Sequence, residues 1–453
     1  MATRVHPAVR WFATAACHIF YRVDCVGDLP RDGPLLLLPN HPNALLDPAL
    51  LWATAERDVR FLAKSTLFKT PLRPILNAGG AIPVYRRSDE GVDTSKNAET
   101  FAAVAAALAD GDAVCLFPEG LSHSKGRLEP LRTGAARMAL AAERNGTSVN
   151  LVAVGLNFDR KVMFRSRVTV VFGAPFVAHD LVPAADAALP GAVRALTDRI
   201  AAHMRELLIE ADPKADAVLV DRVDRLYAAA RGRSQDPHER VVRRRTIAAG
   251  IERLRSVDPE RYGEVMLRLR RYDERLERFG IRDRHLDWQV TNADATRFAV
   301  REILFGIVLL PLAALGLAAF VIPYQLTAIA SRIATRESDV IATAQVVAGT
   351  VIYGVWLAAL MAVAWLIRGS AAALTVAVAT PILALAALFA IERESAVIDA
   401  VRAWLLLRRA SGETRERLRR RRSELADVLD QVYDWMTSAD AATASVGGER
   451  ERR

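Results

Sequence analysis

One short stretch of the sequence combines residue types that could carry out acid–base chemistry. The stretch Pro39-Asn-His-Pro-Asn-Ala-Leu-Leu-Asp-Pro48 follows directly after the apolar run Leu35–Leu38. A carboxylate such as Asp47 can hold an imidazole such as His41 in the tautomer whose second nitrogen accepts a proton. That pairing suits the deprotonation of an alcohol as it attacks a thioester carbonyl. On its own, a histidine near a helix start is more often a capping or packing residue.

Three further blocks follow in the same order as in a known family. They are Gly80-Ala-Ile-Pro-Val-Tyr-Arg86, Phe117-Pro-Glu-Gly120 with its continuation to Thr133-Gly134, and the apolar run Leu151–Leu156. With the His41 block, they make the chain resemble the phospholipid/glycerol acyltransferase superfamily, whose bacterial members include lysophosphatidate acyltransferases. The Phe-Pro-Glu-Gly block is the most specific single match, whereas the last block lacks the proline often found there.

The resemblance implies a role for each matched residue. His41 would be the general base and Asp47 its partner. Arg86 would bind the phosphate of the acceptor, because a guanidinium group can contact phosphate through two parallel hydrogen bonds. Glu119 and Gly120 would shape the same pocket. Three weaker candidates for phosphate binding, each more often a solvated charge than a ligand contact, are Lys64, Lys125 and Arg132.

The spacing between the histidine and the aspartate points to one branch of this superfamily. Five residues separate His41 from Asp47, where four are common in the family. The longer spacing resembles the yeast-type glycerol-3-phosphate/dihydroxyacetone-phosphate acyltransferases. Further matches to that branch are Phe164-Arg-Ser-Arg-Val168 before Phe172-Gly173, the run from Tyr272 to Asp283, and the C-terminal membrane segments. The resemblance implies an acyl-CoA or acyl-carrier-protein donor and a glycerol 3-phosphate or lysophosphatidate acceptor in phospholipid biosynthesis.

Alternating apolar runs and helical patterns predict the fold that positions these residues. Most of the runs are continuously apolar, as in strands buried on both faces, and helical patterns lie between them. This alternation predicts an α/β fold with a largely parallel sheet and flanking helices. The expected strands are 35–38, 81–84, 113–117, 151–156 and 168–172, and the expected helices are 49–55, 97–110 and 133–143.

Composition divides the remaining chain. The 453 residues suggest several structural units: an interfacial N-terminal helix (1–24), an acyltransferase domain (25–215), a charged helical subdomain (216–300), a membrane domain (301–392) and a basic helical tail (393–453). Within the membrane domain, three apolar segments, 303–322, 344–367 and 371–391, are each long enough to cross a bilayer.

The side of the membrane on which the tail lies is left open. Three full crossings would place the arginine-rich tail opposite the catalytic domain, although basic segments prefer the cytoplasmic side. Pro311 and Pro323 allow the first segment to be kinked or re-entrant. Either this segment does not fully cross, or the tail departs from the charge tendency. We expect an integral protein of the cell membrane with its catalytic domain facing the cytoplasm.

Charge and cysteine content indicate which ligands and partners the protein is expected to bind. The net charge of +9 is concentrated on either side of the apolar region, as expected beside anionic lipid headgroups, and no nucleic-acid-binding signature is present. Three cysteines without metal-ligand spacing predict neither a disulfide framework nor a zinc site, and Cys115 is read as a core residue. We expect no metal and no cofactor beyond the thioester donor.

Two other functions compete with this one. A lysophospholipid remodelling acyltransferase would keep the chemistry and change the acceptor. A non-enzymatic membrane scaffold or transporter is less favoured, because charged residues fall only in the breaks between the apolar segments, where they would provide no transport path.

Overall fold

The computed structural model describes residues 5–70, 72–85, 95, 97–211, 214–234, 236–287, 292–335, 340–409 and 412–450. These residues form two compact units. The α/β unit consists of the described parts of Met1–Val218, Gln235–Ala248 and Thr335–Val346. The helical unit consists of the described parts of Leu219–Ser234, Ala249–Ala334 and Val347–Arg453.

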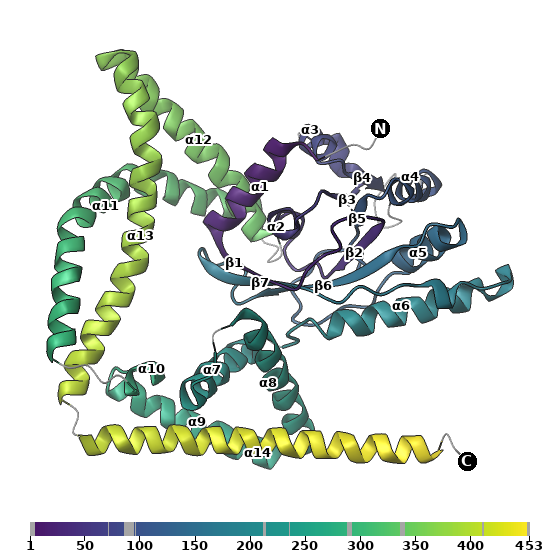
Figure 1. The fold of residues 1–453 in the computed structure, drawn as a ribbon. Helices are drawn as coiled ribbons and strands as arrows, with labels where there is room; N and C mark the ends of the chain where they lie inside the picture. Colours follow the sequence, from purple (N-terminus) through teal and green to yellow (C-terminus); the bar gives the residue numbers. More distant parts are fainter. Residues whose placement is uncertain are drawn as a thin grey trace. The chain divides into compact units, whose positions relative to one another are not determined.

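The α/β unit is built on a seven-stranded sheet in the order β1-β7-β6-β2-β5-β3-β4 (Figure 1). Every neighbouring pair is parallel except β6 and β7, which are antiparallel. The predicted α/β class with a largely parallel sheet is therefore confirmed. The strands are β1 Tyr21–Val26, β2 Leu35–Pro39, β3 Val59–Lys64, β4 Ile82–Val84, β5 Ala113–Cys115, β6 Asn150–Phe158 and β7 Ser166–Phe172.

Helices cover both faces of this sheet. Successive residues of a strand point to opposite faces, so Leu35 and Leu37 of β2 pack into one core and Leu36 and Leu38 into the other. All four leucines are fully buried, which explains why β2 is continuously apolar. Helices α1 Pro7–Phe20 and α2 Leu46–Thr54 cover the first face, and α4 Asn97–Ala109, α5 Gly134–Arg144 and α6 Leu189–Arg205 cover the second.

Two strands of the sheet were not predicted. β1 contains Arg22 and Asp24, and β3 contains Arg60, so neither reads as a continuous apolar run. Ion pairs accommodate these charges. Asp24 Oδ2 lies 2.7 Å from Arg167 Nη1 on the adjacent β7, and Arg60 Nη1 lies 3.2 Å from Asp112 Oδ2. The short helix α3 Arg73–Ala78 was also absent from the prediction.

The helical unit holds most of the remaining helices. Its elements, some of which share residues with the α/β unit, are α7 Lys214–Arg231, α8 Pro237–Val257, α9 Pro259–Arg278, α10 Asp283–Leu286, α11 Asn292–Ala334, α12 Ile341–Arg368, α13 Ser370–Arg409 and α14 Gly412–Arg450. Among the described residues, three segments are long and apolar enough to cross a membrane: Pro311–Ala334, Ile341–Arg368 and Ser370–Ala390. The last two agree with the predicted segments, whereas the first begins and ends further along the chain than predicted.

Candidate active site

His41 lies in the loop that joins β2 to α2, at the carboxyl end of a central strand. Asn40, the residue before it, ties this loop to β6. The Asn40 Oδ1 atom accepts a hydrogen bond from the Leu156 N–H at 2.7 Å, and its Nδ2 donates to the Leu156 carbonyl at 3.3 Å. Ligand sites of parallel sheets form at this edge, outside the carboxyl ends of the strands.

The structure brings His41 and Asp47 together. Their Nδ1 and Oδ2 atoms are 2.8 Å apart, and Asp47 Oδ2 also accepts the Asn43 N–H at 2.7 Å. Asp47 is the second residue of α2, and Ala44 before it adopts a positive φ of 45°. This left-handed turn absorbs the longer spacing between the two residues. With an ionised Asp47 accepting the Nδ1–H, the Nε2 atom of His41 carries the lone pair that can accept a proton.

Asp47 lies in a low-polarity environment. Its side chain is 0% exposed, and that of His41 is 13% exposed. Burial raises the pKa of the Asp47 carboxyl, although hydrogen bonds from His41 and Asn43 oppose part of this shift. Among the described residues, Asp47 Oδ1 has no hydrogen-bond partner. A carboxylate with so little solvation interacts strongly with a positive charge that forms on the neighbouring imidazole.

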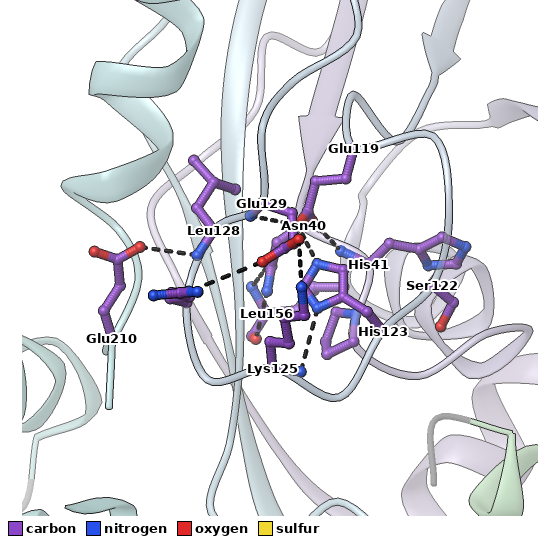
Figure 2. Close-up of polar contacts among 12 residues, drawn as sticks. Asn40, His41, Glu119, Ser122, His123, Lys125, Leu128, Glu129, Leu156 and Glu210 are labelled. Carbon is purple, nitrogen blue, oxygen red and sulfur yellow. Dashed lines mark hydrogen bonds and ion pairs between the residues drawn. The ribbon is translucent and has the colours of Figure 1, made fainter. Parts of the chain in front are cut away.

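Glu119 braces the two loops that meet at His41 (Figure 2). Its Oε1 accepts the backbone N–H of His41 at 3.0 Å, and its Oε2 accepts that of Glu129 at 3.0 Å. The same Oε2 is bonded to His123 Nε2, and the His123 N–H donates to the His41 carbonyl at 3.1 Å. The Glu119 side chain is 1% exposed. These contacts orient the backbone that carries His41, a role the sequence did not suggest.

The ring of Phe117, at the start of the Phe-Pro-Glu-Gly block, supports His41 directly. The two rings stack with centroids 3.8 Å apart and an interplanar angle of 17°. The imidazole is thereby held between an aromatic face and the carboxylate of Asp47, which restricts its rotation. Gly120 adopts a φ of +79°, and a Cβ atom there would lie 3.0 Å from Arg132 Cγ. The turn after Glu119 therefore favours glycine for both backbone and steric reasons.

A second group of residues joins the His41 loop to distant parts of the chain. Asn43 Nδ2 donates to the Tyr21 hydroxyl at 2.8 Å, and that hydroxyl donates to the Lys161 carbonyl. The Lys161 ammonium in turn contacts the Pro42 carbonyl at 2.7 Å and Ser124 Oγ at 2.6 Å. Burial raises the pKa of Tyr21, which therefore remains a neutral donor. Sequence analysis missed this group because Tyr21 and Lys161 are far from the motifs.

The structure describes three of the four predicted phosphate-binding residues. Lys64 ends β3, at the same edge of the sheet as His41. Arg86 follows β4 in the sequence but lies outside the described residues. Lys125 is an exposed ion-pair partner of Glu129 at 2.7 Å, and the exposed Arg132 covers Gly120. Within the described ranges, His, Cys, Asp and Glu side chains form no group of three that could hold a metal ion.

Comparison with known proteins matches this part of the chain to one family. Residues 6–156 match the Acyltransferase family model. The chain is 32% identical over 128 residues to glycerol-3-phosphate O-acyltransferase 1 of Saccharomyces cerevisiae, a match that covers 26% of this chain and 16% of the yeast protein. It is 31% identical over 139 residues to the lyso-ornithine lipid O-acyltransferase of Rhizobium meliloti, covering 30% of this chain and 45% of that protein.

A solved structure also resembles the chain. It is the 1-acyl-sn-glycerophosphate acyltransferase of Thermotoga maritima, at 16% identity and a TM-score of 0.31, covering 44% of this chain and 78% of that one. The curated relatives are matched over less than half of their own lengths. The family match nevertheless includes the segments that hold His41, Asp47 and Glu119, so residues 6–156 carry an acyltransferase-family domain, as the sequence blocks predicted.

Proposed function

We propose that this protein transfers a fatty acyl group from acyl-CoA or acyl-carrier protein to a hydroxyl of glycerol 3-phosphate or lysophosphatidate. The observation that carries this proposal is the contact between His41 Nδ1 and Asp47 Oδ2 at the carboxyl end of β2. It leaves one imidazole nitrogen able to take the proton of an alcohol. The acyltransferase-family domain supports the reaction class.

The proposed reaction begins with the acceptor hydroxyl beside His41 Nε2. The imidazole takes the hydroxyl proton as the oxygen attacks the thioester carbonyl carbon, and the carbonyl electron pair moves onto oxygen. When this tetrahedral intermediate collapses, the C–S bond breaks and the imidazolium returns the proton to the leaving thiolate. Asp47 stabilises the imidazolium and fixes its tautomer. The products are an ester and a free thiol.

A covalent acyl-enzyme on cysteine is not part of this mechanism. Cys115 is fully buried in β5, and burial raises the pKa of its thiol well above the usual value. Burial likewise raises the pKa of Cys17 to about 12. Since the thiolate is the reactive form, neither thiol is suited to nucleophilic attack. Direct attack by the acceptor therefore remains the proposed route, with no cofactor besides the donor.

The acceptor class is proposed from the yeast relative and from basic residues. The matched yeast protein is named a glycerol-3-phosphate O-acyltransferase, and the basic side chain of Lys64 lies at the same sheet edge as His41. We propose that Lys64 and Arg86 bind the acceptor phosphate. A lysolipid acceptor is the second candidate, because another matched protein is named a lyso-ornithine lipid O-acyltransferase. Such a headgroup carries no phosphate.

An acceptor screen tests this proposal and separates the two candidates. The full-length protein, purified in detergent, is given one radiolabelled acyl thioester and either glycerol 3-phosphate, lysophosphatidate or a lyso-ornithine lipid. We expect labelled ester with a phosphate-bearing acceptor. Ester formed only from the phosphate-free lysolipid would refute the proposed acceptor class, and no ester from any acceptor would refute acyl transfer.

A further inference from the structure

The first turn of α12 is part of the α/β unit that holds His41. Ala342 is 1% exposed and lies in the same core cluster as Leu46 and Leu50 of α2. Val346 packs against this cluster. Thr343 is 6% exposed, and its Oγ1 donates to the Asn43 carbonyl at 3.4 Å. The second apolar segment therefore begins inside the catalytic core, next to the loop that carries His41.

Beyond this turn, α12 has the properties of a membrane span. Of its 28 residues, the 22 from Val347 to Arg368 follow this turn. At about 1.5 Å per residue, that length exceeds a hydrocarbon core of about 30 Å. Large apolar side chains are exposed along it, such as Val351 at 60% and Leu366 at 77%. Gly369, with a φ of +80°, permits a tight turn into α13, whose apolar part ends at Ala390. The two helices can form a membrane hairpin.

Contacts of α14 fix the side to which the chain returns. Arg415 Nε and Arg419 Nε donate to the Leu286 carbonyl at 2.8 and 2.9 Å. Arg422 donates to the Asp283 carbonyl at 2.8 Å and contacts Asp287 Oδ1 at 2.7 Å. The start of α14 and the residues of α10 are therefore on one side of the membrane. An even number of crossings must separate residue 287 from residue 412.

The chain before α11 stays on the side of the active site. The first half of α8 belongs to the α/β unit, where Arg240 lies 2.7 Å from Asp159. The rest of α8 and all of α9 are rich in charged residues, which are costly in a hydrocarbon core. Residue 287 is thus on the side of His41, and so is Ile341. An even number of crossings must also separate these two residues, and α11 holds the one apolar segment among the described residues between them.

We infer that α11 does not cross the membrane but enters and leaves it on the side of the active site. On this inference, α12 and α13 are the two crossing helices, and the arginine-rich tail lies on the catalytic side. The conflict between three crossings and the position of the basic tail is thereby resolved. Because Thr343 contacts Asn43, the His41 loop lies at the membrane surface, where a lipid acceptor or product would reside.

The construction of α11 fits a re-entrant segment. Pro311 and Pro323 lie within the helix, and each removes a backbone hydrogen bond, which permits bending. Between these prolines, Ala319 accepts a hydrogen bond from Trp356 Nε1 at 2.9 Å, and Phe320 stacks on Tyr353. These partners are near the middle of α12, about 20 Å along it at about 1.5 Å per residue.

Residues of α11 before and after Ala319 and Phe320 make further contacts with α12 and α13. Further along α11, the methyl group of Thr327 lies close to Gly349, which is nearer the start of α12. A Cβ atom placed on Gly349 would be 3.5 Å from Thr327 Cγ2. Gly316, before Ala319, lies against the backbone of Leu383 in α13. The deepest part of α11 is therefore the region around residues 316–320, which is bracketed by Arg301 and Arg332. Arginines at both ends of an apolar segment suit two ends at one membrane surface.

Labelling of single thiols in sealed cells tests this arrangement in the full-length protein. Native Cys25 is exposed in β1 and reports the side of the catalytic unit. In a Cys25→Ser background, cysteine is introduced as Ala334→Cys at the end of α11, Ser370→Cys at the α12–α13 turn, or Ser438→Cys in α14. A membrane-impermeant maleimide is then applied before and after permeabilisation.

We expect Ala334→Cys and Ser438→Cys to react from the same side as native Cys25, and Ser370→Cys to react from the opposite side. Reaction of Ala334→Cys from the side of Ser370→Cys would mean that α11 crosses, which overturns the inference. Reaction of Ser438→Cys from the side opposite to Cys25, or of Ser370→Cys from the same side, would overturn it too. Ile333→Cys, at a side chain that is 80% exposed, repeats the α11 measurement if Ala334→Cys fails to accumulate in membranes.

Discussion

Two buried carboxylates act on His41 in different ways. Asp47 contacts the imidazole ring, whereas Glu119 contacts the backbone N–H of the same residue. Asp47 can therefore fix the tautomer of the ring, and Glu119 can fix the position of the loop that carries it. Asp47 was predicted from its place after His41, and Glu119 from the resemblance of the Phe-Pro-Glu-Gly block to the family. The sequence could not distinguish their roles. Glu119 contacts a backbone N–H group, which any residue type provides, so the amino-acid sequence does not reveal the contact.

Asp47→Asn is expected to lower the rate of acyl transfer while leaving the fold intact. An asparagine does not hold the imidazole in the required tautomer or stabilise the imidazolium, and loss of that support costs on the order of ten-thousandfold in kcat in a comparable pair. Steady-state thiol release, measured with the purified variant, checks this. A kcat within about threefold of the parent would argue against a catalytic role for this pair.

The same substitution predicts a pH-dependent change in stability. Burial raises the pKa of the Asp47 carboxyl above its value in the unfolded chain. In the unfolded chain the carboxyl group therefore loses its proton at a lower pH than in the folded protein. As the pH rises between these two pKa values, the contribution of Asp47 to the free energy of unfolding falls. Asparagine has no such proton. The Tm of Asp47→Asn minus that of the parent should therefore be larger at neutral pH than in acid; a difference that shrinks with rising pH would contradict the shift.

Glu119→Gln should reduce both stability and activity. A glutamine offers one acceptor oxygen where two backbone N–H groups, of His41 and Glu129, now donate. Leaving one buried donor without a partner costs about 1–3 kcal/mol, and the displaced His41 loop should lower kcat. Thermal unfolding and thiol release measure the two effects. Glu143→Gln is the matched control, because the buried Glu143 accepts the Val149 N–H away from the site. Its kcat should stay unchanged, whatever the change in its Tm.

Lys161→Met distinguishes a positioning residue from a phosphate-binding one. The ammonium joins the Pro42 carbonyl to Ser124 Oγ, so its loss should loosen the loop that carries His41. We expect kcat to fall by about tenfold, with a smaller change in the KM for the acceptor. Kinetics with glycerol 3-phosphate measure both constants. A rise in KM with kcat unchanged would instead assign Lys161 to phosphate binding.

At the scale of elements, strands that are buried on both faces were predicted correctly. Strands that carry charged residues, which are paired only in the folded sheet, were missed. β2, β5, β6 and β7 are buried on both faces and therefore appear in the sequence as apolar runs. β1 and β3 carry charges that only the folded sheet brings to their partners. The contacts of Tyr21 and Lys161 with the His41 loop, and of Thr343 with Asn43, depend on long-range packing and leave no local signal.

The junction between α12 and the catalytic core predicts an effect of a distant substitution on activity. Ala342→Leu would force a larger side chain into a core where Ala342 is 1% exposed, and overpacking of this kind typically costs about 1–3 kcal/mol. The strain lies beside Asn43 and should reduce kcat as well as Tm. Ala348→Leu, two residues beyond the turn that packs in the core, is the control. Equal activity in both variants would contradict the coupling.

At the scale of the whole molecule, the catalytic and membrane segments are interleaved in the sequence. The α/β unit takes in residues from the α11–α12 connection, more than a hundred residues after its sheet ends. The sequence predicted a catalytic domain followed by a membrane domain, because composition reports on local solvent and not on tertiary contacts. On the proposed function and topology, this interleaving would anchor the active site to the bilayer through α12, which starts within the core of the α/β unit.

The central claim, that His41 is the base of an acyl transfer, is tested most directly by one kinetic comparison. Full-length parent, His41→Ala and His179→Ala proteins are assayed for thiol release from one acyl thioester, with and without glycerol 3-phosphate. His179 is an 85%-exposed histidine whose ring lies 3.8 Å from Glu143, so its variant controls for loss of a histidine as such. We predict acceptor-dependent release by the parent and by His179→Ala, and none above background by His41→Ala. Release by His41→Ala at the parent rate would contradict the claim.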